Sequence, residues 1–349
     1  MAPSIRAYNS SEAGMTLNHD ISPGLWTLAW RRLRADRIAM AALAVVGAFL
    51  LLLVLSSSGL VANDWEKEVA VNYAPPGFIG ADPASAALAR PQAPTPPNAF
   101  DPLAQELAQL KEQVQASHPQ RPKALTLPFG ADKWGHDVLK KTIKGGETSI
   151  VVGLVAAFVA VALGTLFGAI SGFYGGVVDD LFNWFYSIFT SIPSILMILT
   201  VAAVLQQKGV ATIVLILGLT GWTGPYRLIR AEYIKHKARE YVMAADAIGA
   251  SNWRKMFSHI FPNVSHVALV QLSILVVGFI KAEVILSFLG FGVPVGTVSW
   301  GSMLNEAQNE LILGKWWQLA AAAGAMALLV TAFSLFTDAL RDALDPKLK

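Results

Sequence analysis

The residues that could perform chemistry are few and scattered in this sequence. There is no cysteine, which excludes disulfides, thiol nucleophiles and thiolate metal sites. The phosphate-binding pattern G-x-x-x-x-G-K-[ST] is missing, because Gly314-Lys315 stands in the wrong context. The zinc pattern H-E-x-x-H is also missing, and the six histidines fall in different segments. The pair Asp179-Asp180 is interpreted as a helix cap in a short turn. We therefore expect no enzyme activity, no cofactor and no metal site.

The composition indicates a membrane protein. Of 349 residues, 54% are hydrophobic and 15% are charged, whereas soluble domains have roughly 45–50% apolar and about 25% charged residues. The 27 basic and 24 acidic residues nearly cancel, so no overall field favours nucleic acid as a partner. The expected fold class is an all-α integral membrane protein.

Six apolar runs predict membrane-spanning helices, since a hydrocarbon core of ~30 Å takes about 20 helical residues. The runs cover residues 38–61, 149–172, 181–205, 209–225, 264–289 and 317–337. The fourth is short, so it either tilts little or continues as helix beyond the membrane. The first is too long and begins too late for a cleaved signal peptide, and we predict an uncleaved span.

Basic residues beside the spans predict the orientation, because they resist translocation. They gather before the first span, between the fourth and fifth spans, and in the tail, which a six-span chain places on one side, taken as cytoplasmic. Four lysines before the second span disagree, but they follow a long loop, and long loops cross largely regardless of charge. The predicted divisions are a cytoplasmic N-terminal segment 1–37, the first span, an external insertion 62–127, a transmembrane core 128–337 and a cytoplasmic tail 338–349.

The external insertion divides by composition. Residues 75–102 contain eight prolines, which favours an extended linker without a packed core. Asp101-Pro102 then supplies an N-cap and an N1 proline, and four apolar residues follow on one helical face, namely Leu103, Leu107, Leu110 and Val114. A short amphipathic helix packed on the surface is expected there.

Two features inside the spans have testable roles. Gly164, Gly168 and Gly172 recur every four residues, which predicts a stripe where a neighbouring helix packs closely. Glu283 is an ionisable group near the outer end of the fifth span, where it needs water or a partner. It is a candidate for lining a translocation path, and a structural hydrogen bond or ion pair is the alternative.

The cytoplasmic segment 226–263 is polar and basic, and it predicts two helices with a break at Gly249 and an N-cap at Ser251. Small residues cluster in it and form a surface that another protein's backbone could approach, or the segment serves only as a charged loop that keeps the topology. The small residues are Ala244, Ala245, Ala247, Gly249 and Ala250.

The run from Glu240 to Ser251, followed by His259 to Asn263, resembles the EAA loop of ABC importer permeases of the dipeptide and oligopeptide family. Further stretches resemble the C-type permease subunit of that family, at residues 129–139, 172–179, 286–292 and 340–346. The resemblance covers about residues 25–61 and 127–349. His136 and Ala131 depart from the usual Arg and Thr, and other details are more similar to the branch that includes importers of microcin C and unusual peptides.

The resemblance implies a six-helix ABC importer permease bundle, with the external insertion between spans one and two, in a bacterial inner (plasma) membrane with both termini cytoplasmic. The expected partners are a second permease subunit, one or two kinds of ATPase subunit, an extracellular or periplasmic solute-binding protein docked on residues 290–316 and the external segment, and membrane lipid. The residues that it assigns to ATPase coupling are Glu240, Ala244, Ala245, Gly249, Ala250, Ser251, His259 and Pro262.

Two alternatives from other classes stay open at this point. An ATP-independent secondary carrier or channel would show internal repeats and charged or broken helices at midmembrane. A membrane-anchored scaffold would use its external insertion as the working part, which the expected lack of a core there disfavours.

Overall fold

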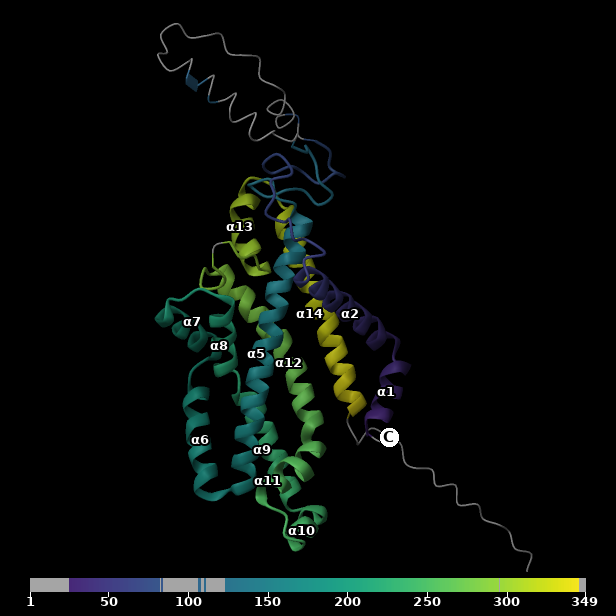
Figure 1. The fold of residues 1–349 in the computed structure, drawn as a ribbon, viewed down its shortest axis with the longest axis vertical. Coiled ribbons are helices and arrows are strands. Elements are labelled where there is room, and N and C mark those ends of the chain that lie inside the picture. The colour runs from purple at the N-terminus through teal and green to yellow at the C-terminus, as the bar shows by residue number, and fades with distance from the viewer. Residues whose placement is uncertain are drawn as a thin grey trace, which may run out of the picture.

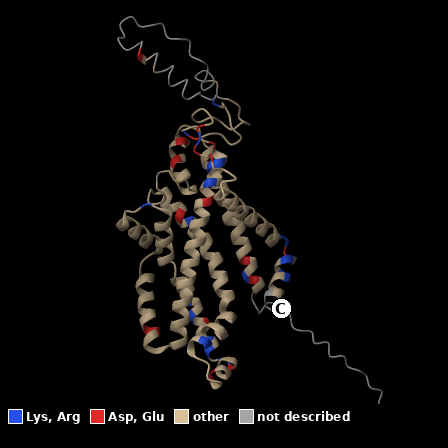
Figure 2. Cartoon of the chain, viewed as in Figure 1, with Lys and Arg blue, Asp and Glu red and all other residues tan. Residues whose placement is uncertain are grey.

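The computed structural model describes residues 25–81, 83, 106, 107, 110, 123–294 and 296–344, and the regular elements among them are all helices (Figure 1). Charged residues are concentrated toward the two ends of the bundle, and the helices between them are largely uncharged (Figure 2). This distribution fits a chain whose middle is buried in hydrocarbon, where ionised groups are costly.

Four of the described helices are long and apolar enough to cross a membrane. They are α2 (Arg37–Ser57), α5 (Val138–Tyr174), α12 (within the continuous helical stretch Asn252–Phe288) and α14 (Trp317–Leu344). A fifth crossing follows if α6 (Gly176–Ser191) and α7 (Ser194–Leu205) form one broken span. The chain is thus a multi-pass membrane protein, and the sixth crossing stays a prediction that rests on the short α8 (Val210–Thr220) and the helix α9 (Thr223–Lys237) that follows it.

The apolar run expected as one helix over 181–205 is interrupted at Ile192-Pro193. Helices α6 and α7 meet there at an angle of 86°. Proline has no N–H to donate to a helical hydrogen bond, and it pushes the residue before it out of the helical region. Ile192 accordingly has an extended backbone, with φ −104° and ψ 132°.

Helix α5 lies at the centre of the bundle and packs closely against α9 along the glycine stripe. A Cβ placed on Gly164 or Gly172 would lie 2.6 Å from the carbonyl oxygen of Trp222 or Arg230, respectively. On Gly168 it would lie 2.8 Å from the carbonyl oxygen of Tyr226. All three obstacles are backbone atoms, two within α9 and one in Trp222, the residue directly before it, so only glycine permits this separation.

The end of the bundle away from α10 contains a small packed cap (Figure 1). Residues 69–77 run beside residues 124–137, joined by hydrogen bonds such as Tyr73 N to Asp132 O (2.9 Å) and Ala131 N to Ala74 O (2.8 Å). The side chains of Ala70, Ala74 and Ala131 are buried between them. The predicted boundary at residue 127 therefore runs through a folded unit, whose tight turns and small residues bury little area and leave a weak hydrophobic pattern. Most of the helix predicted after Asp101-Pro102 lies outside the described residues.

The two described ends of the chain pack together. Ala29 and Leu33 of α1 (Leu25–Ala35) are buried against Ala343 and Leu344 at the end of α14. Between α1 and α2, the Asp36 carboxylate accepts hydrogen bonds from the N–H groups of Ile38 (2.8 Å) and Ala39. This cap starts a new helix and lets α1 leave the axis of α2.

Candidate functional site

The segment between α9 and α12 forms a compact projection at one end of the bundle (Figure 1). It contains α10 (Glu240–Ala247), α11 (Asn252–Arg254) and a π-helical turn, Lys255–Ile260, that leads directly into α12 (Phe261–Phe288). Gly249 follows α10 with φ +83°, a left-handed conformation that glycine adopts without strain. The Ser251 hydroxyl then accepts a hydrogen bond from Arg254 N (3.3 Å) and caps the next helix.

One face of α10 packs inward. Val242 and Ala245 are each 4% exposed, and Val242 belongs to a cluster with Tyr233, Met256 and Ile260. The Lys255 ammonium lies 2.5 Å from Asp246 Oδ1, which ties the π-helical turn to α10. Ala245 was expected to meet the ATPase, but its side chain points into this chain's own interior. It holds α10 in place and does not form the outer surface.

The opposite face of the same projection is exposed and apolar. Ile248 is 84% exposed, Trp253 63% and Met243 56%. Of the other residues predicted for coupling, five are exposed and two are half-buried. Glu240, Ala244, Gly249, Ser251 and Pro262 are exposed, and Ala250 and His259 are half-buried. We name the exposed side chains Met243, Ile248 and Trp253 the loop apolar surface.

Met243, Ile248 and Trp253 are not among the residues predicted for coupling, although the sequence contains a signal for them. Large apolar side chains in a basic, polar segment outside the membrane need a reason, because water does not favour their exposure. The sequence pattern alone gave no means of deciding that Val242 faces inward while Met243 faces outward.

A polar junction joins α9 to the start of α6. The Arg230 guanidinium donates to both carboxylate oxygens of Asp179, from Nε at 2.6 Å and from Nη2 at 2.5 Å. The hydroxyl of Ser171, near the end of α5, donates to the same carboxylate and lies 3.0 Å from the Tyr226 hydroxyl. Asp179 had been interpreted as a helix cap, but its carboxylate makes an ion pair across helices instead. A bidentate pair fixes direction as well as distance.

Glu283 is buried completely. Its carboxylate accepts hydrogen bonds from the hydroxyls of Ser149 on α5 and Ser287 on α12, each at 2.6 Å. Ser149 Oγ in turn accepts a hydrogen bond from Trp300 N (3.2 Å). Glu283 thus joins α5 to α12 through hydrogen bonds, and its place on a translocation path stays a prediction.

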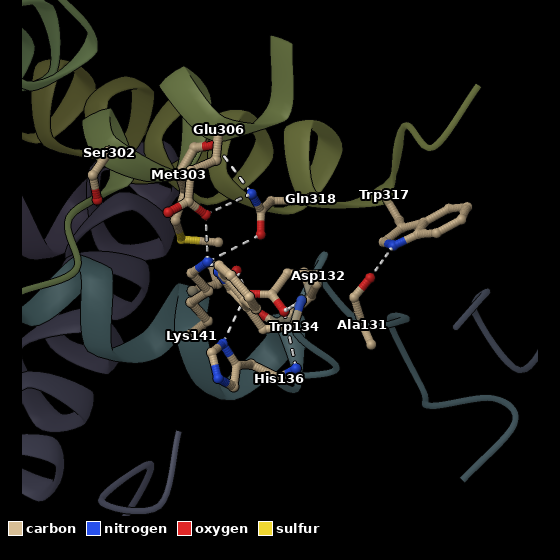
Figure 3. Close-up of polar contacts among 12 residues, drawn as sticks. Ala131, Asp132, Trp134, His136, Lys141, Ser302, Met303, Glu306, Trp317 and Gln318 are labelled. Atoms are coloured by element: carbon tan, nitrogen blue, oxygen red, sulfur yellow. Dashed lines mark hydrogen bonds and ion pairs between the residues drawn. The ribbon is translucent and has the colours of Figure 1, made fainter. Parts of the chain in front are cut away.

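A second polar cluster lies beside the cap (Figure 3). The ammonium of Lys141, on α5, donates to Asp132 Oδ2 (2.7 Å) and to Glu306 Oε2 (2.6 Å). Gln318 of α14 lies beside it, at 3.4 Å from the ammonium. Burial alone would raise the pKa of Asp132. The nearby Lys141 ammonium outweighs burial and holds that pKa below its ordinary value. The cluster joins the cap to α5, α14 and α13 (Trp300–Ile312).

Glu310, also on α13, is buried near this cluster. Neither oxygen of its carboxyl group has a hydrogen-bond partner among the described residues. Burial raises the pKa of Glu310 from an ordinary 4.5 to about 7. Across the described part of the chain, no three His, Asp or Glu side chains are grouped so as to hold a metal ion.

The described chain is a multi-pass helical bundle with a projection at one end and a small cap at the other, which fits a membrane permease subunit. The chain belongs to the family of inner membrane components of binding-protein-dependent transport systems, whose sequence profile matches residues 164–349. Residues 24–76 match the N-terminal transmembrane domain of oligopeptide transport permease C. This is a family of transport components, and the chain is such a component rather than an enzyme.

Curated relatives agree with this assignment. The oligopeptide transport system permease protein OppC of Bacillus subtilis is 37% identical over 221 residues, which are 63% of this chain and 72% of the relative. The dipeptide transport system permease protein DppC of the same organism is 35% identical over 63% of this chain and 69% of its own length. The OppC protein of Haemophilus influenzae is 36% identical over 63% of this chain and 70% of its own length.

Proposed function

We propose that this chain is one of two permease subunits of an ATP-driven importer for peptides or peptide-like solutes. It forms the translocation path together with a second permease, and separate ATPase subunits supply the energy. The family and the names of the relatives support this assignment. The loop apolar surface is the observation in the structure that carries it.

The loop apolar surface fits a protein partner that binds outside the membrane. Its three large side chains project from a segment whose other face is firmly packed, so the surface is preformed and loses little entropy on docking. Helix α9 enters this segment and the π-helical turn leaves it for α12 without a break. A force on the projection therefore acts directly on two helices of the bundle, as a rocking transport cycle requires.

Helix α6 supports the second permease as a partner. It contains no buried residue, and several of its large apolar side chains are strongly exposed in the isolated chain. A second permease that covers this face would remove that surface from contact with lipid or the path. The exposed side chains include Val177, Leu181 and Trp184.

The cap offers a surface to an external solute-binding protein. Phe78 of the cap and Trp316, after α13, are exposed and have ring centroids 6.4 Å apart. With this end external, the projection and the paired α1 and α14 ends lie on the cytoplasmic side, as the arginines beside α2 favour. The importer would then sit in a bacterial inner membrane with both termini cytoplasmic.

A secondary carrier is supported by the broken helix in this structure but not by the residues around the break. The bend between α6 and α7 is a broken helix of the kind that carriers use. Residues 181–205 around it contain no charged side chain. A broken helix without an ionisable group offers no proton site, so the ATP-driven assignment is the better supported.

The test is co-purification of the tagged chain in mild detergent, with mass spectrometry of the associated subunits. Wild type is expected to bring an ATPase and a second permease. Ile248→Asp is expected to lose the ATPase and keep the second permease, because it places a charge in the docked surface. Ile248 is a better test site than Ala245, whose burial means that a glutamate there would disrupt α10 itself.

Leu60→Asp is the matched control. Leu60 is a strongly exposed apolar residue that follows α2, at the end of the bundle away from the loop apolar surface. The variant is expected to keep the ATPase. A wild-type chain that purifies alone would refute the importer assignment. An ATPase retained by Ile248→Asp would refute the docking role of the loop apolar surface.

A further inference from the structure

Helix α1 presents a basic face that has no described partner. Its sequence, LWTLAWRRLRA, places Ala29 and Leu33 four residues apart on one face, and both are buried against the end of α14. Arg31 and Arg34 are three residues apart on another face, and both are exposed. Since α1 already has its packing partner on the first face, the second face is exposed among the described residues.

The charge on this segment is strongly one-sided. Residues 25–37 contain four arginines and a single acidic residue, Asp36, whose carboxylate is engaged in capping α2. Arg32 faces α14, where its guanidinium lies 3.4 Å from Ala343 O and near Asp342. Arg31, Arg34 and Arg37, which are all exposed, therefore form the outward basic set. The arginines of α1 colour part of that helix blue in Figure 2.

The position of α1 places this set at the membrane boundary. Arg37 is the first residue of α2, and 20 residues without a charge follow it in that span. The apolar layer begins there, so α1 lies at its edge. Trp30 is 52% exposed and Leu28 38% exposed, and side chains of this kind anchor helices in the headgroup region.

We propose that α1 is a binding site for the phosphate-bearing headgroup of an anionic phospholipid, held by Arg31 and Arg34. Guanidinium groups bind phosphate oxygens in a bidentate manner. Trp30 and Leu28 lie beside the acyl chains near the headgroup. An anionic lipid is favoured over a free anion because exposed arginines lie beside exposed apolar side chains. The arginines fit the headgroup phosphate, and the apolar side chains fit the lipid surface around it.

The test is native mass spectrometry of the complex purified through the full-length chain, with phosphatidylglycerol as the probe and phosphatidylcholine of the same acyl chains for comparison. Wild type is expected to bind phosphatidylglycerol in preference. Arg31→Gln with Arg34→Gln is expected to weaken that binding roughly 25-fold, about fivefold per arginine removed. Arg31→Lys with Arg34→Lys keeps both charges and is expected to retain most of it.

Lys208→Gln with Arg227→Gln is the matched control, because it removes two exposed charges elsewhere. It is expected to leave the affinity for phosphatidylglycerol unchanged. The proposal is overturned if both double variants weaken binding equally, or if phosphatidylcholine binds as well as phosphatidylglycerol. It is also overturned if inorganic phosphate at equal concentration displaces the lipid, or if the glutamine variant loses a protein subunit in place of lipid.

Discussion

Replacing Gly168 with alanine tests the close packing of α5 against α9. The added methyl group would lie 2.8 Å from the Tyr226 carbonyl oxygen and 3.0 Å from Arg230 N. Ordinary contacts begin at 3.4 Å, so α9 has to move by about 0.6 Å, because both obstacles are helix backbone. Such overpacking costs about 1–3 kcal/mol, against a gain of up to ~1 kcal/mol from alanine's helix propensity.

Gly278→Ala provides the control for this substitution. Gly278 also lies inside a long helix, α12, but a Cβ there would meet nothing within 4 Å. Only the gain in helix propensity applies, so the two variants should differ by about 1–3 kcal/mol. The assay is thermal unfolding of the detergent-purified complex, where about 2–4 °C corresponds to each kcal/mol in a chain of 150–250 residues and less in a longer one.

We expect Gly168→Ala to unfold several degrees below Gly278→Ala. It should also reduce transport, because α9 leads into the projection that carries the loop apolar surface. If Gly168→Ala unfolds at the same temperature as Gly278→Ala or above it, the two helices are not packed as closely as described. The explanation of the glycine stripe would then be wrong.

Three further outcomes follow from the polar clusters. Asp179→Arg should impair transport, because it places two positive charges together at the polar junction. Adding Arg230→Asp in the same chain should restore part of the transport. An uptake assay that shows no rescue would contradict the pairing. Glu310→Gln should remove a pH dependence of stability. The pKa of Glu310 is about 7 in the folded protein and an ordinary 4.5 when unfolded, so the folded state favours the protonated carboxyl group. The contribution of this group to stability is therefore fully present below about pH 4.5 and is lost as pH rises through 7. Melting temperatures of both proteins between pH 5 and 8 check this, and parallel curves would refute it. Lys141→Met should destabilise the chain by about 3–5 kcal/mol, because it removes the buried ammonium that faces both Asp132 and Glu306 and leaves Asp132 only His136 and two backbone N–H groups. Lys144→Met, which removes a more exposed partner, should cost about 1 kcal/mol or less.

Much of the fold could be predicted from the sequence because long uncharged runs have few alternatives in a membrane. The all-helical class and the permease family are confirmed. The break at Pro193 was visible as a residue type, but hydropathy counts apolar side chains and takes no account of a missing N–H. The cap was missed because Ala70, Ala74 and Ala131 bury small side chains that leave no strong periodic pattern.

The lysines that disagreed with the predicted orientation are explained by contacts across the fold. Lys140 pairs with Asp64 at 2.8 Å and Lys144 with Glu147 at 2.7 Å. Lys141 pairs with Asp132 and Glu306. Counting basic residues along the chain includes these lysines at full charge, whereas in the structure three of the four have an acidic partner, and Lys133 lies over the ring of Trp134 instead. The pairing with Glu306 spans 165 residues, which no local pattern could reveal.

The Lys141 cluster also has a consequence for biogenesis. Synthesis runs from the N-terminus, so Lys141 leaves the ribosome long before Glu306 and Gln318 exist, and until then Asp132 is its only carboxylate from the cluster. The outer end of α5 can therefore reach its final arrangement only when α13 and α14 have been inserted. The complete set of contacts around Lys141 therefore forms only in a chain that has been synthesised through the start of α14.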